Sequence, residues 1–262
     1  MNQFEETGQS EKKIKSMADF DTMVEKINAN KHGELIFRGQ SDSSWNIVSS
    51  AYRYLQQIYP SINMTETILG YFKSNVRKDI EELRSLNEEY KHLKTDDEVM
   101  CVLQHLGGKS TFVDFSTDPH IALYFACEQF HDYKDGIVFV MFHDNESIYN
   151  KAEEIVGGYK SVKLDDGNLA QKRISMQKSC FLDSSSCPIV INDESKIERI
   201  IVDKNSKKRI LEELKYENIY RNTVYPDILA YINDQKLTKD TVSLKSVIFR
   251  ETAQRIKDGC VR

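Results

Sequence analysis

The sequence has little proline, no excess of positive charge and no long hydrophobic run. Only 4 of its 262 residues are proline, and no low-complexity linker divides the chain. The net charge of −5 creates no general basic field of the kind that attracts nucleic acid or an anionic membrane. No apolar run approaches the roughly 18 residues that a transmembrane helix needs, and the polar N-terminus lacks the apolar core of a signal peptide. We therefore expect a cytoplasmic protein without a membrane partner, and nucleic acid is disfavoured as a ligand.

Several motifs that would indicate a particular chemistry are also absent from the sequence. The five cysteines are scattered, with no Cys-x-x-Cys or His-x-x-x-His pair, so we expect reduced thiols and no metal cofactor. A Gly-x-Ser-x-Gly nucleophile motif and a Walker phosphate loop are absent as well. The sequence thus gives no sign of a hydrolase with a serine triad or of a P-loop enzyme.

The hydrophobic pattern is typical of an α/β (α+β) protein. Residues 136–142, GIVFVMF, give the clearest strand, because β-branched and aromatic residues fill this run. We expect one domain over residues 16–262, with a small mixed or antiparallel sheet surrounded by helices, after a disordered leader at 1–15. The expected helices begin near Ser16 and cover about 65–90, 99–106, 118–130, 206–214 and 240–257, and the expected strands cover 34–38, 110–116, 136–142 and 199–202.

Arg38 is the first candidate site residue. It follows the apolar run 35–37 and precedes Gly39 and Gln40, so a charge stands at the end of a buried strand. A charge in that place is either paired in the core or faces a ligand. Trp45, in the turn that follows, is expected to be a packing aromatic rather than a platform for base stacking.

Residues 103–126, LQHLGGKSTFVDFSTDPHIALYFA, form the second candidate region. A strand there brings Asp114, Ser116 and Thr117 to the start of a helix, whose first turn offers unpaired N–H groups and the positive end of its dipole. The hydroxyls would then hold an anion or nucleotide, or they would simply cap the helix. His105 and Asp114 form a candidate acid–base pair, with a structural hydrogen bond in the core as the alternative.

Five stretches in order resemble the FRG domain, named for its Phe-Arg-Gly motif, over roughly residues 20–235: FRGQSDSSWNIVSSAYR, LQHLGG…VDFSTDPHIALYFA, DGIVFV, RISMQKSCFL and VYPDIL. The central motif of the family reads Gln-His-(aromatic)-Gly-x-Pro-Thr-Arg-Leu-Leu-Asp-Trp-Thr. Thr111 stands where the family has arginine, and Phe115 where it has tryptophan. Four motif residues are kept, namely Gln104, His105, Gly107 and Asp114.

A looser similarity links the chain to ADP-ribosyltransferases of the Arg-Ser-Glu type. Its basis is an arginine at the end of a first core strand and a Ser-Thr segment that leads into the A-x-x-F-A helix at 122–126. The resemblance implies that Arg38 holds the phosphates or ribose of NAD, since a guanidinium fork suits a diphosphate. It also implies that Ser116 and Thr117 brace the nicotinamide side, and that a glutamate on a later strand binds the ribose.

That glutamate has no counterpart in the expected segment, 170–182, which contains no acidic residue. Gln177 takes the best position, with Arg173 four residues before it. Glutamine can orient a ribose hydroxyl but cannot supply the negative charge that favours a cationic transition state. Glu198 could replace it only if the fold brings this side chain to the pocket.

Two hypotheses follow. In the first, the protein binds NAD and acts as an ADP-ribosyltransferase or NAD glycohydrolase, which the resemblance associates with toxins or antiviral defence. In the second, the same pocket is a non-catalytic sensor of a nucleotide, of another anionic small molecule or of a protein partner. The candidate catalytic residues are Arg38, His105, Asp114 and Gln177. The candidate cofactor-binding residues are Arg38, Gly39, Gln40, Gln104, Ser116, Thr117 and Arg173.

Overall fold

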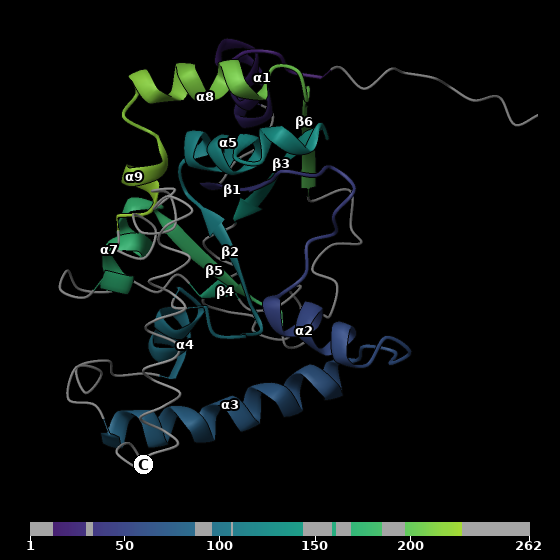
Figure 1. Cartoon of the computed structure of the whole chain (residues 1–262), viewed down its shortest axis with the longest axis vertical. Helices are drawn as coiled ribbons and strands as arrows, with labels where there is room; N and C mark the ends of the chain where they lie inside the picture. Colours follow the sequence, from purple (N-terminus) through teal and green to yellow (C-terminus); the bar gives the residue numbers. More distant parts are fainter. Residues whose placement is uncertain are drawn as a thin grey trace, which may run out of the picture.

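An antiparallel sheet forms the centre of the structure, which is a computed structural model (Figure 1). The structure describes residues 13–29, 34–86, 96–105, 107–143, 159–160, 169–184 and 197–226. Within these ranges six strands pair in the order β4-β5-β2-β1-β3-β6. The strands are β1 (Glu34–Gln40), β2 (Phe112–Ser116), β3 (Gly136–His143), β4 (Tyr159–Lys160), β5 (Ser179–Asp183) and β6 (Ile197–Val202).

The sheet has a seam between its two central strands. β1 pairs with β2 at a single position, Phe37 opposite Ser116, whereas β1 and β3 pair along the whole of β1. The sheet therefore consists of two halves, β1-β3-β6 and β2-β5-β4, that are joined at one point. Beyond that point the two central strands diverge and leave room for side chains.

Two groups of helices pack against the two halves of the sheet (Figure 1). The first group contributes to the core on the β1-β3-β6 half and comprises α1 (Met17–Ala29), α5 (Pro119–Cys127) and α8 (Lys207–Tyr216). The second group lies on the β2-β5 half and comprises α3 (Glu66–Leu86), α4 (Asp96–His105) and α7 (Leu169–Met176). Two further helices, α2 (Ser50–Ile58) and α9 (Arg221–Val224), and a 3-10 turn, η2 (Phe130–Asp132), complete the described elements.

Two glycines allow α5 to lie directly on the sheet. A Cβ atom on Gly39 would overlap the main-chain oxygen of Ala122 and would lie 2.8 Å from the nitrogen of Ala126. On the neighbouring strand, a Cβ atom on Gly136 would likewise overlap the main-chain oxygen of Ala126. One close backbone contact thus joins the glycine of the Phe-Arg-Gly motif to the small residues of the A-x-x-F-A helix.

The predicted α+β fold is confirmed, and most predicted elements are found within two or three residues of their expected bounds. The helix α2 was not predicted from the sequence, although Ser49 caps it by accepting a hydrogen bond from the N–H of Tyr52. The segment 170–182, where the resemblance places the glutamate of a later strand, contains most of the helix α7, a turn and most of the strand β5. The helix expected at 240–257 lies outside the described residues. No helix in the described ranges is long and apolar enough to cross a membrane.

Candidate functional site

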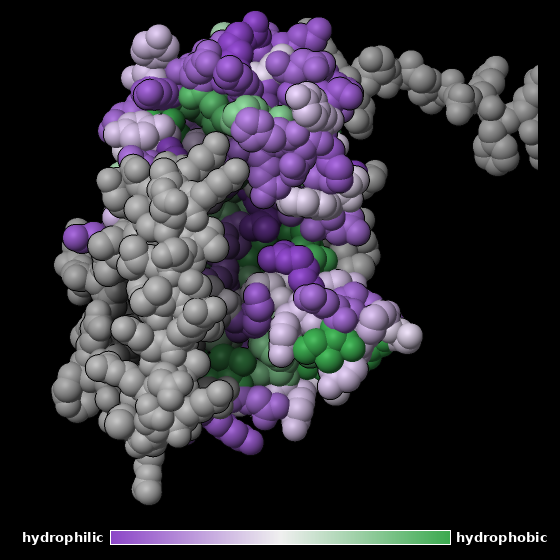
Figure 2. All heavy atoms as spheres, in the orientation of Figure 1, coloured by the Kyte–Doolittle hydropathy of each residue, from purple (hydrophilic) through white to green (hydrophobic). Residues whose placement is uncertain are grey.

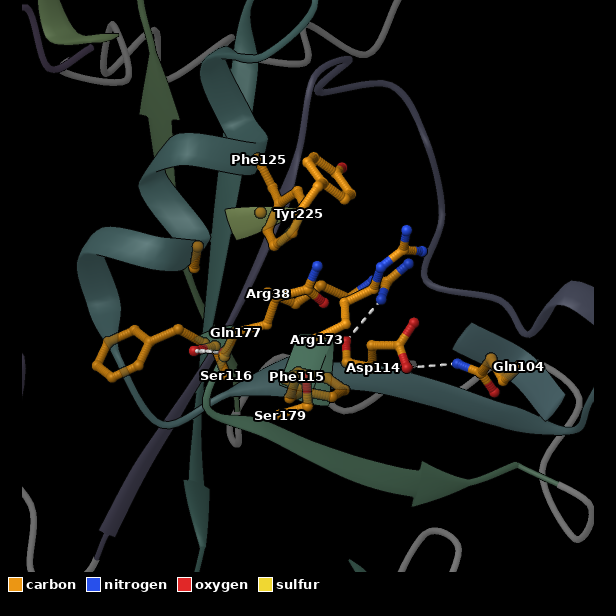
Figure 3. A pocket seen from close by; sticks show the side chains of 13 residues that line it. Arg38, Gln104, Asp114, Phe115, Ser116, Phe125, Arg173, Gln177, Ser179 and Tyr225 are labelled. Atoms are coloured by element: carbon orange, nitrogen blue, oxygen red, sulfur yellow. Dashed lines mark hydrogen bonds between the residues drawn. The ribbon is translucent and has the colours of Figure 1, made fainter. Parts of the chain in front are cut away.

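A cavity of about 280 Å³ opens at the seam of the sheet, between the two groups of helices. β1 and β2 supply its floor, and α5, α7 and the end of α9 supply its sides. Figure 3 shows the side chains that surround it. They mix charged, amide, hydroxyl and aromatic groups, namely Phe37, Arg38, Gly39, Gln104, Asp114, Phe115, Ser116, Ala122, Phe125, Arg173, Gln177, Ser179 and Tyr225.

Arg38 spans the gap where the two central strands no longer pair. Its Nη1 donates a hydrogen bond to the main-chain oxygen of Asp114, at 2.6 Å. Its Nε is enclosed and has no hydrogen-bond partner in the described part of the structure. Burial lowers the pKa of Arg38, the charge of Asp114 opposes this change, and the charge of Arg53 adds to it. Arg38 is thus a half-buried cation with unused donor capacity, which is uncommon for a purely structural residue.

The carboxylate of Asp114 is held in place by a short chain of polar side chains. The amide nitrogen of Gln104 donates to Oδ1 of Asp114, and the hydroxyl of Ser110 donates to the amide oxygen of Gln104. Ser110 is itself fixed, because its N–H donates to the hydroxyl of Ser50 at 2.9 Å. Gln104, expected as a cofactor ligand, therefore has both ends of its amide engaged, and its clearest role is to position Asp114.

Ser116 and Gln177 connect the sheet to the last described segment. The Ser116 hydroxyl donates to the main-chain oxygen of Gln177 at 2.8 Å, and the Gln177 amide nitrogen donates to the main-chain oxygen of Val224 at 3.1 Å. Both residues are buried and line the cavity. These bonds hold the residue after Val224, Tyr225, at the cavity wall.

Tyr225 lies between charged groups on the cavity wall. The guanidinium carbon of Arg173 lies 5.3 Å from the centre of its ring, and the Phe125 ring packs edge-on against it at 6.0 Å. Its hydroxyl donates to Glu128 at 3.0 Å. Burial raises the pKa of Glu128, although this hydrogen bond and the charge of Arg221 oppose the change. In Figure 3 the side chains of Arg38 and Arg173 run into the space between Tyr225 and Asp114.

A second cavity, of about 610 Å³, adjoins the first. It lies between the turn after β1 and the end of α5, and Figure 2 shows this face of the molecule hollowed at mid-height, with hydrophilic side chains in the hollow. The two cavities share three lining residues, Arg38, Gly39 and Phe125. The other residues that line the second cavity are Gln40, Ser41, Ser44, Trp45, Asn46, Val48, Tyr52, Arg53, Glu128 and Gln129.

The start of α5 is already occupied by a carboxylate. Asp118 accepts hydrogen bonds from the N–H groups of His120 and Ile121, and its other oxygen pairs with Lys178 at 2.7 Å. The expected anion site at this helix terminus is therefore replaced by a cap, which was the alternative interpretation. Thr117 is exposed and outside both cavity linings, because its hydroxyl turns toward the main-chain oxygen of Lys178.

Most of the candidate residues nevertheless meet at one place. Gln40 lines only the second cavity, and the exposed Glu198 on β6 lines neither. The side chain of His105, at the end of α4, is outside what the structure describes, so its pairing with Asp114 stays a prediction. Phe125, Glu128 and Tyr225 were missed, since a single aromatic or acidic residue in or just after a helix carries no signal of its own. The candidates around the first cavity are Arg38, Gly39, Gln104, Asp114, Ser116, Arg173 and Gln177.

Comparison with known families now identifies the region that carries this seam. The family model of the FRG domain matches residues 33–135. The chain contains an FRG domain. The match begins just before β1 and ends just before β3, so it includes Arg38, Asp114 and α5. Neither the curated proteins nor the solved structures gave a match.

The FRG domain supplies only part of the cavity. Its match is shorter than the expected resemblance over residues 20–235, and Arg173, Gln177 and Tyr225 lie beyond it. The motif residues inside the match have clear structural roles: Gly39 admits α5, Gln104 positions Asp114, and Arg38 crosses the seam. Among the described residues, no group of three or more His, Cys, Asp or Glu side chains could hold a metal ion.

Proposed function

We propose that the FRG domain and the segment after it bind a nucleotide with a diphosphate, of the NAD type, in the cavity at the seam. The observation that carries this proposal is Arg38, whose enclosed Nε has no partner, in a cavity to which Arg173 adds a second guanidinium. A guanidinium offers several donors in one plane, which matches the oxygens of a phosphate. Two arginines against one carboxylate, Asp114, give the described lining an excess of positive charge.

The rest of the lining suits the other parts of such a ligand. Phe115, Phe125 and Tyr225 provide flat apolar walls, and the volume of the two adjoining cavities is in the range of about 300–1,000 Å³ that small-molecule sites occupy. The amide nitrogen of Gln177 is engaged with Val224, which leaves its side-chain oxygen to accept a bond from a ribose hydroxyl. This is the ribose role expected of Gln177 from the sequence.

The binding proposal is tested by calorimetry of the whole chain with NAD, ADP-ribose and nicotinamide in separate titrations. Because the arginines hold the diphosphate, ADP-ribose should keep most of the affinity of NAD, within about tenfold or 1.4 kcal/mol. Nicotinamide alone should bind weakly. If ADP-ribose and NAD both fail to bind, the proposal is wrong. Tight binding of nicotinamide alone would also contradict it, because the affinity would then come from the nicotinamide and not from the diphosphate.

A second function, cleavage of the bound nucleotide, is favoured by the carboxylate of Asp114 in the same cavity. Cleavage breaks the bond between C1′ of the ribose and the nicotinamide nitrogen, and the electron pair of that bond leaves with neutral nicotinamide. Water or an acceptor hydroxyl then bonds to C1′ and releases a proton. A fixed negative charge stabilises the cationic ribosyl group between these two events. Asp114 would thus supply the charge that Gln177 cannot.

Release of nicotinamide from NAD tests this second function, with Asp114→Asn as the variant. We expect release by the native chain and a loss of at least about 100-fold in the variant, which keeps the shape and the bond to Gln104. Binding without release in the native chain would leave the sensor hypothesis. If release occurs, expression in a growing host should arrest growth as a toxin or defence effector does, and the variant should relieve the arrest.

A further inference from the structure

The second cavity contains features that the binding of a diphosphate does not use. Its wall carries Trp45, which is 47% exposed and outside the described core clusters, so the expectation of a packing aromatic is wrong. The half-buried rings of Tyr52 and Phe125 line the same cavity. Three aromatic rings around an open cavity favour a flat, unsaturated ligand group, because such groups stack on or pack against rings.

The turn that carries Trp45 is firmly anchored. The carboxylate of Asp42 accepts bonds from the N–H and the hydroxyl of Ser44, at 3.0 and 2.7 Å, and its other oxygen pairs with Lys134 at 2.5 Å. The N–H of Trp45 donates to the main-chain oxygen of Asp42 at 3.2 Å. The indole is thus exposed on a rigid turn, which is how a binding platform is presented.

Gln40 adds an unused hydrogen-bond acceptor to this cavity. The residue is 7% exposed, and its side-chain Oε1 is enclosed without a partner in the described part of the structure. Its orientation is fixed, because its Nε2 donates to the main-chain oxygen of Asn46 at 3.4 Å, and a reversed amide would set two oxygens against each other. A buried acceptor without a partner is costly, so a donor group in a ligand would relieve it.

The two cavities meet at Arg38 and Phe125, so one ligand could occupy both. We infer that the second cavity holds the base of the nucleotide, and that Oε1 of Gln40 accepts a hydrogen bond from an exocyclic amino group, as on adenine. This assignment rests on the proposed function, since it names the base of the nucleotide whose phosphates face Arg38 and Arg173. Bases that carry a carbonyl oxygen at the same place are excluded, because two acceptors would then face each other.

The chain provides its own reporter for this assignment, because Trp45 is its only tryptophan. A base that enters the second cavity must change the tryptophan fluorescence, whereas inorganic pyrophosphate, which needs only the two arginines, should change it little. The discriminating pair of ligands is NAD and its hypoxanthine analogue, in which a carbonyl oxygen replaces the exocyclic amino group and the adjacent ring nitrogen, an acceptor in adenine, carries a hydrogen. We expect NAD to bind at least about tenfold more tightly than the analogue, the usual effect of one hydrogen bond to a buried acceptor.

Gln40→Met removes the acceptor at nearly constant volume, and Gln57→Met is the matched control, an exposed amide on α2 outside both cavity linings. The first variant should bind NAD and the hypoxanthine analogue equally, and the control should keep the native preference. The thermal midpoint of each variant confirms that it is folded.

Four results would overturn the assignment. Equal affinity of the native chain for the two dinucleotides, or NAD binding that leaves Trp45 fluorescence unchanged, would place the base elsewhere while nucleotide binding stands. Retention of the preference in Gln40→Met would exclude Gln40 as the acceptor. If neither dinucleotide produces heat or a change in fluorescence, the proposed function and this assignment both fail.

Discussion

Arg38 donates a hydrogen bond from its side chain to the main-chain oxygen of Asp114, at the place where the two central strands have stopped pairing. The guanidinium therefore takes a position at which an ordinary sheet would have a ladder bond. It joins the two halves of the sheet and at the same time lines both cavities. The arginine of the Phe-Arg-Gly motif thus combines a structural contact with a place in the lining of both cavities.

Arg38→Met tests which of these roles dominates. The substitution loses a charge-assisted hydrogen bond, worth about 1.5–3 kcal/mol, but it also removes an enclosed donor without a partner, which costs about 1–3 kcal/mol. We expect the free energy of unfolding, measured with urea, to change by less than about 1 kcal/mol, while NAD binding is lost. A loss of stability above about 3 kcal/mol would mean that Arg38 acts chiefly as a structural residue.

Gly39→Ala should destabilise the fold strongly. The new Cβ would meet main-chain atoms of Ala122 and Ala126, which cannot move aside as a side-chain end can, so α5 must shift from the sheet. We expect a loss of at least about 3 kcal/mol in the free energy of unfolding. The matched control is Gly70→Ala, on the exposed side of α3 with nothing within 4 Å, which should instead gain about 0.5–1 kcal/mol. Equal effects of the two changes would contradict the close contact.

Which of these relationships the sequence could predict depends on how far apart the residues are along the chain. The strands, the cap at Asp118 and the candidates Arg38 and Asp114 follow from local pattern and from the resemblance to the FRG domain. The contact of Arg38 with the main-chain oxygen of Asp114 joins residues 76 positions apart, and no periodicity encodes a sheet that splits. The sequence also suggests the start of α5 as an anion site, but in the structure the carboxylate of Asp118 already accepts hydrogen bonds at that terminus.

The aromatic residues that line the cavity could not be predicted from the sequence for a related reason. Tyr225 lies at the cavity beside Val224, whose main-chain oxygen accepts a hydrogen bond from Gln177, a contact across 47 positions. Phe125 sits in an apolar helix, where an aromatic residue is expected to be core. Nothing in their local sequence distinguishes these two rings from packing residues, and only the fold shows that they line a cavity.

The turn after β1 should lose stability in acid through Asp42. The hydrogen bonds from Lys134 and Ser44 lower the pKa of Asp42 from its ordinary 3.8 to about 2. Because the pKa is lower in the folded state, the stabilisation is complete above about pH 4 and disappears as the pH falls toward about 2. In thermal melts near neutral pH, the midpoint of the native protein should be higher than that of Asp42→Asn. This difference in midpoint should disappear as the pH falls from about 4 to about 2. A gap that stays constant down to pH 2 would contradict the shifted pKa.

Tyr225 should support binding through its ring rather than its hydroxyl. The ring lies against Arg173 and Phe125, whereas the hydroxyl faces Glu128, away from the first cavity's lining. We expect Tyr225→Phe to keep the Kd for NAD within about twofold and Tyr225→Leu to raise it about three- to thirtyfold, the range of one cation–π contact. Calorimetry measures both values. A large loss in the Phe variant alone would transfer the role to the Tyr225–Glu128 hydrogen bond.

The central claim is that the guanidiniums at the seam hold an anionic nucleotide, and calorimetry of Arg173→Gln with NAD tests it most directly. Lys172→Gln is the matched control, because Lys172 is an exposed neighbour on α7, outside both cavity linings, and its loss changes the net charge equally. We expect the Kd for NAD to rise at least about tenfold in the Arg173 variant and to stay within about twofold in the control. Equal effects in the two variants, or none in either, would contradict the claim.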